Sequence, residues 1–162
     1  MRLTHFNKAE LKEIFDRYED IANESEGVIE KADFLAITEF QCCPIASVVF
    51  DRETNIKTKI TMEFVDFCML LDVFSKATPM PVKAKYLFDL IRKPELQYIT
   101  IEEYTYLMRE LSAANHIPLP GFTAMIEQSW LLVSTDGKLD LNGFSANLSP
   151  IELHSVMTID FL

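Results

Sequence analysis

The chain has 162 residues, which is enough to bury a core as one domain or as two small lobes. Hydrophobic residues make up 49% of the chain and charged residues 25%, a composition that favours a folded soluble protein over a disordered chain. The formal net charge of −10 argues against a nucleic acid partner, because phosphate binding needs clustered Lys and Arg.

The sequence predicts a cytoplasmic protein without a membrane anchor. No apolar run approaches the ~18 residues that a membrane span needs, and no signal peptide is visible. The three cysteines, Cys42, Cys43 and Cys68, match no zinc-site spacing. We therefore expect reduced thiols that serve as small buried hydrophobes.

The first predicted helix has a clear start. Asn7 is a good N-cap, and Glu10, three residues later, completes a capping box. Apolar residues then recur at helical spacing as far as Tyr18, and an acidic, turn-prone stretch ends at Gly27. A second helical pattern begins at Lys31 and continues through the sequence KADFLAITEF.

This pattern of helix, loop and helix recurs three more times, over residues 60–74, 82–111 and 121–148. The period is roughly 35–45 residues, which a helical-repeat solenoid can also show. A Pro-marked break at residues 77–81 predicts two lobes, residues 1–76 and residues 77–162, the second with a short C-terminal tail.

Two segments, GVIEKADF and GKLDLNGF, favour the EF-hand over the solenoid. Each places a hydrophobic β-former two residues after Gly and an aromatic residue seven after it. The predicted fold is therefore all-α, an EF-hand of the calmodulin-like superfamily with four helix–loop–helix units in two lobes. Short β-pairing joins neighbouring loops, and Leu139 is expected to pair with Ile99.

Five further segments carry a resemblance to a known family. They are LTHFNKAELKEIF, CCPIASVVFD, FVDFCMLLDVFS, VKAKYLFDLI and the closing VMTIDFL. In this order and spacing the chain resembles the calcineurin B-like branch of the EF-hand superfamily, as a divergent member with degenerate calcium loops. That branch includes a phosphatase regulatory subunit, plant calcium sensors and the calcineurin B homologous proteins.

The first loop is the best supplied with calcium ligands. Calcium takes about 6–8 oxygens, usually from loop positions 1, 3, 5, 7, 9 and a bidentate acid at 12. The alternative for this loop is a solvated acidic turn. The candidate metal ligands are Asp20, Glu24, Glu26, Glu30 and Asp33.

The other three loops depart from this pattern. The second has no Gly and carries lysines where anions are needed. The third, residues 92–103, keeps Glu103 at its end but opens on Arg92. The fourth, residues 132–143, retains donors in its middle but has Leu132 and Gly143 at its two ends. We therefore expect no cofactor, with calcium considered only at the first loop.

No catalytic group is assembled in the sequence. The three histidines are isolated, and neither a nucleophile elbow nor a phosphate-cradling glycine loop is present, so we expect no enzyme. The resemblance implies instead an apolar groove that holds an amphipathic helix of a larger protein. The candidate groove residues are Met69, Leu70, Val73, Phe74, Tyr106, Leu107, Leu111 and Trp130.

Two functional hypotheses follow from this resemblance. The first is a calcium-independent adaptor or light-chain subunit, suited to a stable assembly such as a cytoskeletal or ciliary one. The second is a calcium-responsive regulatory subunit of a protein phosphatase or kinase that uses a residual site in the first loop.

Overall fold

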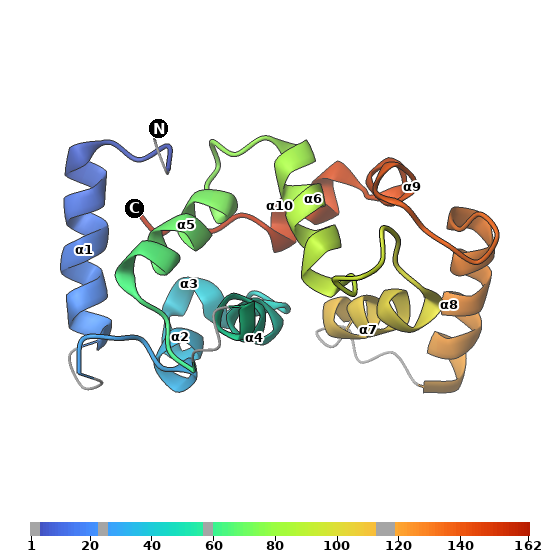
Figure 1. Cartoon of the computed structure of the whole chain (residues 1–162), viewed down its shortest axis with the longest axis horizontal. Helices are drawn as coiled ribbons and strands as arrows, with labels where there is room; N and C mark the ends of the chain where they lie inside the picture. The colour runs from blue at the N-terminus through green and yellow to red at the C-terminus, as the bar shows by residue number, and fades with distance from the viewer. Residues whose placement is uncertain (1–3, 23–25, 57–59, 113–118) are drawn as a thin grey trace. The chain divides into compact units, whose positions relative to one another are not determined.

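The computed structural model describes residues 4–22, 26–56, 60–112 and 119–162. Within these residues every regular element longer than a single β-bridge is a helix (Figure 1). The chain divides into two compact units, of which the first is Met1–Pro79 with Val156–Leu162 and the second is Met80–Ser155. None of the described helices is both long and apolar enough to cross a membrane.

The first unit contains five helices in the described residues. These are α1 (Lys8–Ala22), α2 (Lys31–Ala36), α3 (Thr38–Gln41), α4 (Ala46–Ile56) and α5 (Phe64–Phe74). The predicted capping box at the start of α1 is confirmed. The Asn7 side chain accepts from the backbone N–H of Ala9 at 2.8 Å, and Glu10 accepts from the Asn7 N–H at 2.7 Å.

The helix expected from Lys31 onward is interrupted at Ile37, which separates α2 from α3. Ile37 has an extended backbone, with φ −61° and ψ 123°, and its side chain is buried. On an unbroken helix Phe34 and Phe40 would point about 120° apart. The break lets their rings meet, with centroids 4.4 Å apart. The core therefore overrides the local helical pattern.

An antiparallel bridge joins the two loops of the first unit. Ile29 and Met62 exchange backbone hydrogen bonds of 3.0 and 2.9 Å, and both side chains are buried. The Tyr18 hydroxyl of α1 lies 3.1 Å from the carbonyl oxygens of Gly27 and Met62. One side chain thus ties α1 to both loops.

The C-terminal tail, Val156–Leu162, belongs to the first unit. The Ile159 N–H donates to the Phe74 carbonyl at 3.1 Å, and the Phe161 ring lies 5.4 Å from that of Phe67. Arg17 of α1 places its guanidinium 3.7 Å from the centroid of the Phe161 ring. Figure 1 shows the red end of the chain beside α5.

These contacts give a different division from the one expected from the sequence. The sequence placed the boundary at residues 76/77 and the tail in the second lobe, whereas the structure divides the chain after Pro79 and groups the tail with the first unit. The physical reason is burial, because Met157 and Phe161 are both buried there.

The second unit contains five helices in the described residues. They are α6 (Met80–Ile91), α7 (Ile101–Ser112), α8 (Leu119–Val133), α9 (Leu141–Asn147) and α10 (Pro150–Val156), whose last residue is grouped with the first unit. Ile99 and Leu139 form an antiparallel bridge with hydrogen bonds of 2.9 and 3.2 Å. Phe88 of α6 and Phe144 of α9 pack with ring centroids 5.6 Å apart.

All three cysteines are free thiols. Cys68 is buried as expected and Cys43 is half-buried, but the expectation is wrong for Cys42, which is exposed. Burial raises the pKa of the Cys43 and Cys68 thiols to about 11. These two thiols are therefore protonated at neutral pH and poorly reactive, as small apolar side chains would be.

Removing the tail's aromatic anchor should destabilise the first unit. We expect Phe161→Ala to lower the free energy of unfolding by about 3 kcal/mol, because the change empties a packed site. The neighbouring Leu162 is 45% exposed, so Leu162→Ala is a matched control that should change stability little. Chemical unfolding followed by circular dichroism measures both, and equal stabilities for the two variants would contradict the docked tail.

Candidate functional site

The first loop does not gather its acidic residues around one point in the described part of the chain. Asp20 lies exposed on α1, and Glu26 has a left-handed backbone with φ 57° beside Gly27 with φ 84°. Glu30 and Asp33 form a capping box at the start of α2, in which Asp33 accepts from the Glu30 N–H at 3.4 Å. The candidate Glu24 lies outside the described residues.

Across residues 4–22, 26–56, 60–112 and 119–162, no three His, Cys, Asp or Glu side chains come together in a way that would hold a metal ion. The expectation of no cofactor, with calcium considered only at the first loop, stays a prediction, since one candidate ligand is not described. The second loop's Lys57 and Lys59 also lie outside the described residues.

The fourth loop is a tight hairpin turn. Thr135 and Lys138 exchange backbone hydrogen bonds of 2.8 and 3.0 Å across Asp136 and Gly137. Both central residues have positive φ, 51° and 70°, as a type I′ turn requires. Asp-Gly suits this turn, because Gly adopts positive φ at no steric cost and Asp tolerates it.

The carboxylate that remains in the second half of this loop caps a helix. Asp140 accepts from the Gly143 N–H at 2.8 Å at the start of α9. A Cβ at Gly143 would lie 3.0 Å from Leu139 Cδ1, so an acid at this position would have to displace that buried side chain. Leu132, at the opposite end of the loop, is exposed.

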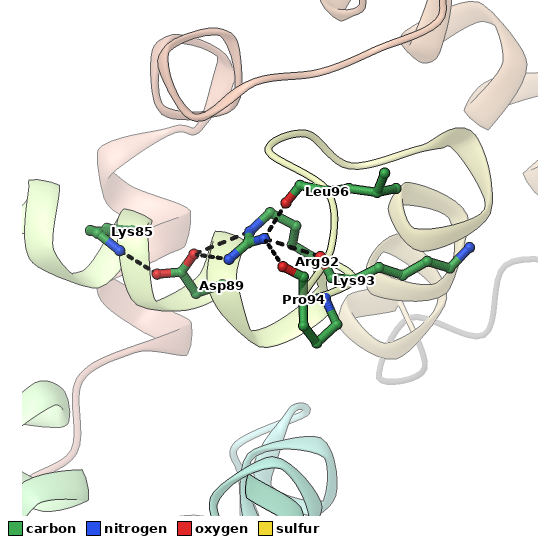
Figure 2. Close-up of polar contacts among 6 residues, drawn as sticks. All are labelled: Lys85, Asp89, Arg92, Lys93, Pro94 and Leu96. Carbon is green, nitrogen blue, oxygen red and sulfur yellow. Dashed lines mark hydrogen bonds and ion pairs between the residues drawn. The ribbon is translucent and has the colours of Figure 1, made fainter.

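The third loop contains its own cations. Glu103, the retained terminal acid, is buried and accepts from the Thr100 N–H at 2.6 Å, and its other oxygen lies 3.7 Å from the Lys93 ammonium. At the opposite end, Figure 2 shows the Arg92 side chain between Asp89 and several backbone carbonyl oxygens of the loop.

Comparisons with known proteins bear on this arrangement of helices and loops. No protein-family model matches the chain. The chain is 24% identical to calcineurin B of Naegleria gruberi. The match spans 161 residues, which is 96% of this chain and 88% of the relative. This similarity along nearly the whole chain, together with the all-helical architecture, is consistent with an EF-hand protein.

The eight candidate groove residues divide by exposure. Met69 and Tyr106 are each 45% exposed, on α5 and α7. The other six lie deeper: Val73 and Leu111 are half-buried, and Leu70, Phe74, Leu107 and Trp130 are buried. A partner helix could reach the buried four only if helices within their unit separated, so their part in a groove stays a prediction.

The second unit has a surface hollow of about 380 Å³ between α7 and α8. Its apolar floor includes the buried Phe122 and Ile126, and Tyr106 lies on its edge. Glu102, Arg109 and Glu127 supply charged groups around it. An apolar floor with a charged rim is the arrangement that receives one face of an amphipathic helix.

Sequence reasoning missed the partners of two arginines. Arg17 lies over Phe161 and also pairs with Glu39 at 2.6 Å, and Arg92 donates to the third loop's backbone. The sequence shows only that Arg92 is a cation at a loop position where calcium binding needs an anion. One sequence signal could have indicated that Arg92 binds the loop's backbone. Pro94 and Leu96 follow it in the loop and have no side-chain oxygens, so only their backbone carbonyls can accept hydrogen bonds there.

The ion pair beside the third loop predicts a pH-dependent stability. Partial burial works to raise the pKa of Asp89, but hydrogen bonds and charge from Lys85, and then from Arg92, outweigh it and hold the pKa below its ordinary value. The ionised carboxylate therefore stabilises the folded state at pH values above the ordinary Asp pKa. This contribution is lost as the pH falls through the lowered pKa.

We expect Asp89→Asn to lower the melting temperature at pH 7. The gap, which is the difference in melting temperature between D89N and the wild type, should close as the pH falls below about 3.9. Thermal unfolding between about pH 7 and pH 2.5 measures the gap. The exposed Asp136, changed to Asn, controls for the loss of one carboxylate in the same unit. A gap for D89N that stays constant over this range would contradict the prediction.

Proposed function

We propose that this protein is a non-catalytic, EF-hand-like adaptor or light-chain subunit. Four helix–loop–helix units in two lobes would make up the protein, and an apolar groove would hold an amphipathic helix of a larger protein. Binding would be largely independent of calcium. The similarity to calcineurin B, which is named as a subunit, supports a role within a larger assembly.

The observation that carries the proposal is that carboxylates of the loops cap the starts of helices. Asp33, Glu103 and Asp140 each accept a hydrogen bond from a backbone N–H within a few residues, at the start of α2, α7 and α9. A carboxylate that caps a helix satisfies a backbone donor without any ion. These helix starts therefore keep their order when no calcium is bound.

The exposed apolar side chains support the groove. Val65 and Met69 stand four residues apart on α5 and are 53% and 45% exposed. Side chains at this spacing share one face of a helix. In the second unit, the hollow between α7 and α8 offers a second apolar surface with Tyr106 on its edge.

A calcium titration tests the metal-independent part of the proposal. We expect isothermal titration of the full chain to show no calcium binding tighter than millimolar. We also expect the same melting temperature in calcium and in chelator, because a ligand that binds only the folded state raises it.

The control for this titration replaces the first loop's candidate ligands Asp20, Glu24, Glu26, Glu30 and Asp33 with amides. A micromolar site that is present in the wild type and lost in this variant would favour the calcium-responsive regulatory subunit instead.

Surface variants test the groove. Tagged full-length protein should recover the same partner in calcium and in chelator, and Met69→Asp or Tyr106→Asp should reduce that recovery by about tenfold or more. Both side chains are partly exposed, so these variants should stay folded. Ile151→Asp is the matched control, because Ile151 is an exposed apolar residue outside the predicted groove. Equal recovery of the partner with all three variants would mean that the partner binds outside the predicted groove.

A further inference from the structure

The Arg92 side chain lies inside the third loop. Its Nη1 group donates to the carbonyl oxygens of Lys93 at 3.0 Å, Pro94 at 3.3 Å and Leu96. Its Nε and Nη2 groups face Asp89 Oδ1 at 3.4 and 3.3 Å. Figure 2 shows the guanidinium with the carbonyls on one side and the carboxylate on the other.

The arrangement has the properties of a cation site. Three main-chain oxygens converge on one positive group, and a carboxylate supplies a counter-charge. The Arg92 side chain is only 16% exposed. The two N–H bonds of Nη1 serve three carbonyls, so one N–H bond is shared between two oxygens. Charge-assisted hydrogen bonds of this kind are about twice as strong as neutral ones.

The loop positions explain why the oxygens come from the backbone. Counted from Arg92, Pro94 is third and Leu96 is fifth, where a calcium loop would place side-chain oxygens. Neither residue has such an oxygen, yet the carbonyls of both turn toward the guanidinium. At these positions the loop therefore presents backbone oxygens in place of side-chain oxygens, and the group that they bind is a guanidinium.

We propose that the third loop is a cation site occupied by the chain's own Arg92 guanidinium, and that the space left by Arg92→Ala binds a free guanidinium ion. The fitting ligand is a planar organic cation with several N–H donors. A spherical ion would satisfy the oxygens less well, since the donors of a guanidinium are spread around a plane. This inference does not depend on the proposed partner, nor on whether the first loop binds calcium.

A tethered guanidinium differs from a bound metal in one respect that matters for the loop. Its local concentration does not change with the composition of the solution, because it is part of the chain. Arginine also stays protonated in proteins. The loop is therefore occupied at every calcium concentration, and helices α6 and α7, which it connects, keep their arrangement.

Chemical rescue tests the proposal. We expect Arg92→Ala in the full chain to lower the melting temperature by about 5 °C. Guanidinium chloride at about 50 mM should then recover a substantial part of that loss. General denaturation at this concentration is small, since it grows linearly with denaturant. Sodium chloride at the same ionic strength should give no recovery.

Arg109→Ala is the matched control, because Arg109 is an exposed arginine of the same unit. Guanidinium should not raise the melting temperature of R109A or of the wild type. If R92A does not fold, the rescue is measured as the return of helical circular dichroism on adding guanidinium. Arg92→Lys, which keeps the charge but loses the planar fork, should fold with a melting temperature between those of the wild type and R92A.

Any of several results would overturn the proposal. Among them are a melting temperature of R92A equal to that of the wild type, a guanidinium effect of equal size on R92A and R109A, and the absence of any recovery. A larger rise with calcium than with guanidinium would also overturn it, because the vacated site would then prefer a metal ion.

Discussion

In each unit an antiparallel bridge joins two loops and holds the helices on either side of them. Ile29 pairs with Met62 in the first unit, and Ile99 pairs with Leu139 in the second. All four side chains are at most 2% exposed, so each bridge lies within a core and is shielded from water. A backbone hydrogen bond in such a place is costly to leave unmade. The bridges therefore constrain the loops, and through them the directions of the helices.

Loops held at one point still need their remaining polar groups satisfied, and each unit does this with its own side chains. In the first unit the Tyr18 hydroxyl reaches carbonyls on both sides of the bridge. In the second, Arg92 serves the carbonyls at the start of the third loop and Glu103 serves an N–H near its end. The Arg92 contacts gather a set of backbone oxygens around one positive charge. The proposed calcium-independent adaptor draws on this arrangement.

The parts of this structure that sequence could predict are those governed by neighbouring residues. The capping box of Asn7 and Glu10 needs only a spacing of three residues and helical geometry. The burial of Cys42 was predicted wrongly, because exposure depends on what packs over a residue. For the same reason the helix expected from Lys31 breaks at Ile37, where the packing of Phe34 against Phe40 outweighs local preference.

The sequence by itself determined the helical pattern, and it predicted the pairs of helices around each loop and the departures of those loops from a full set of calcium ligands. These properties depend on composition and on spacings of a few residues. Only the tertiary structure decided that Phe161 packs under Arg17 in the first unit and that the Arg92 guanidinium meets three carbonyl oxygens. The first joins residues 144 positions apart. The second depends on the path of the backbone, because every residue carries a carbonyl and only the fold determines which ones converge.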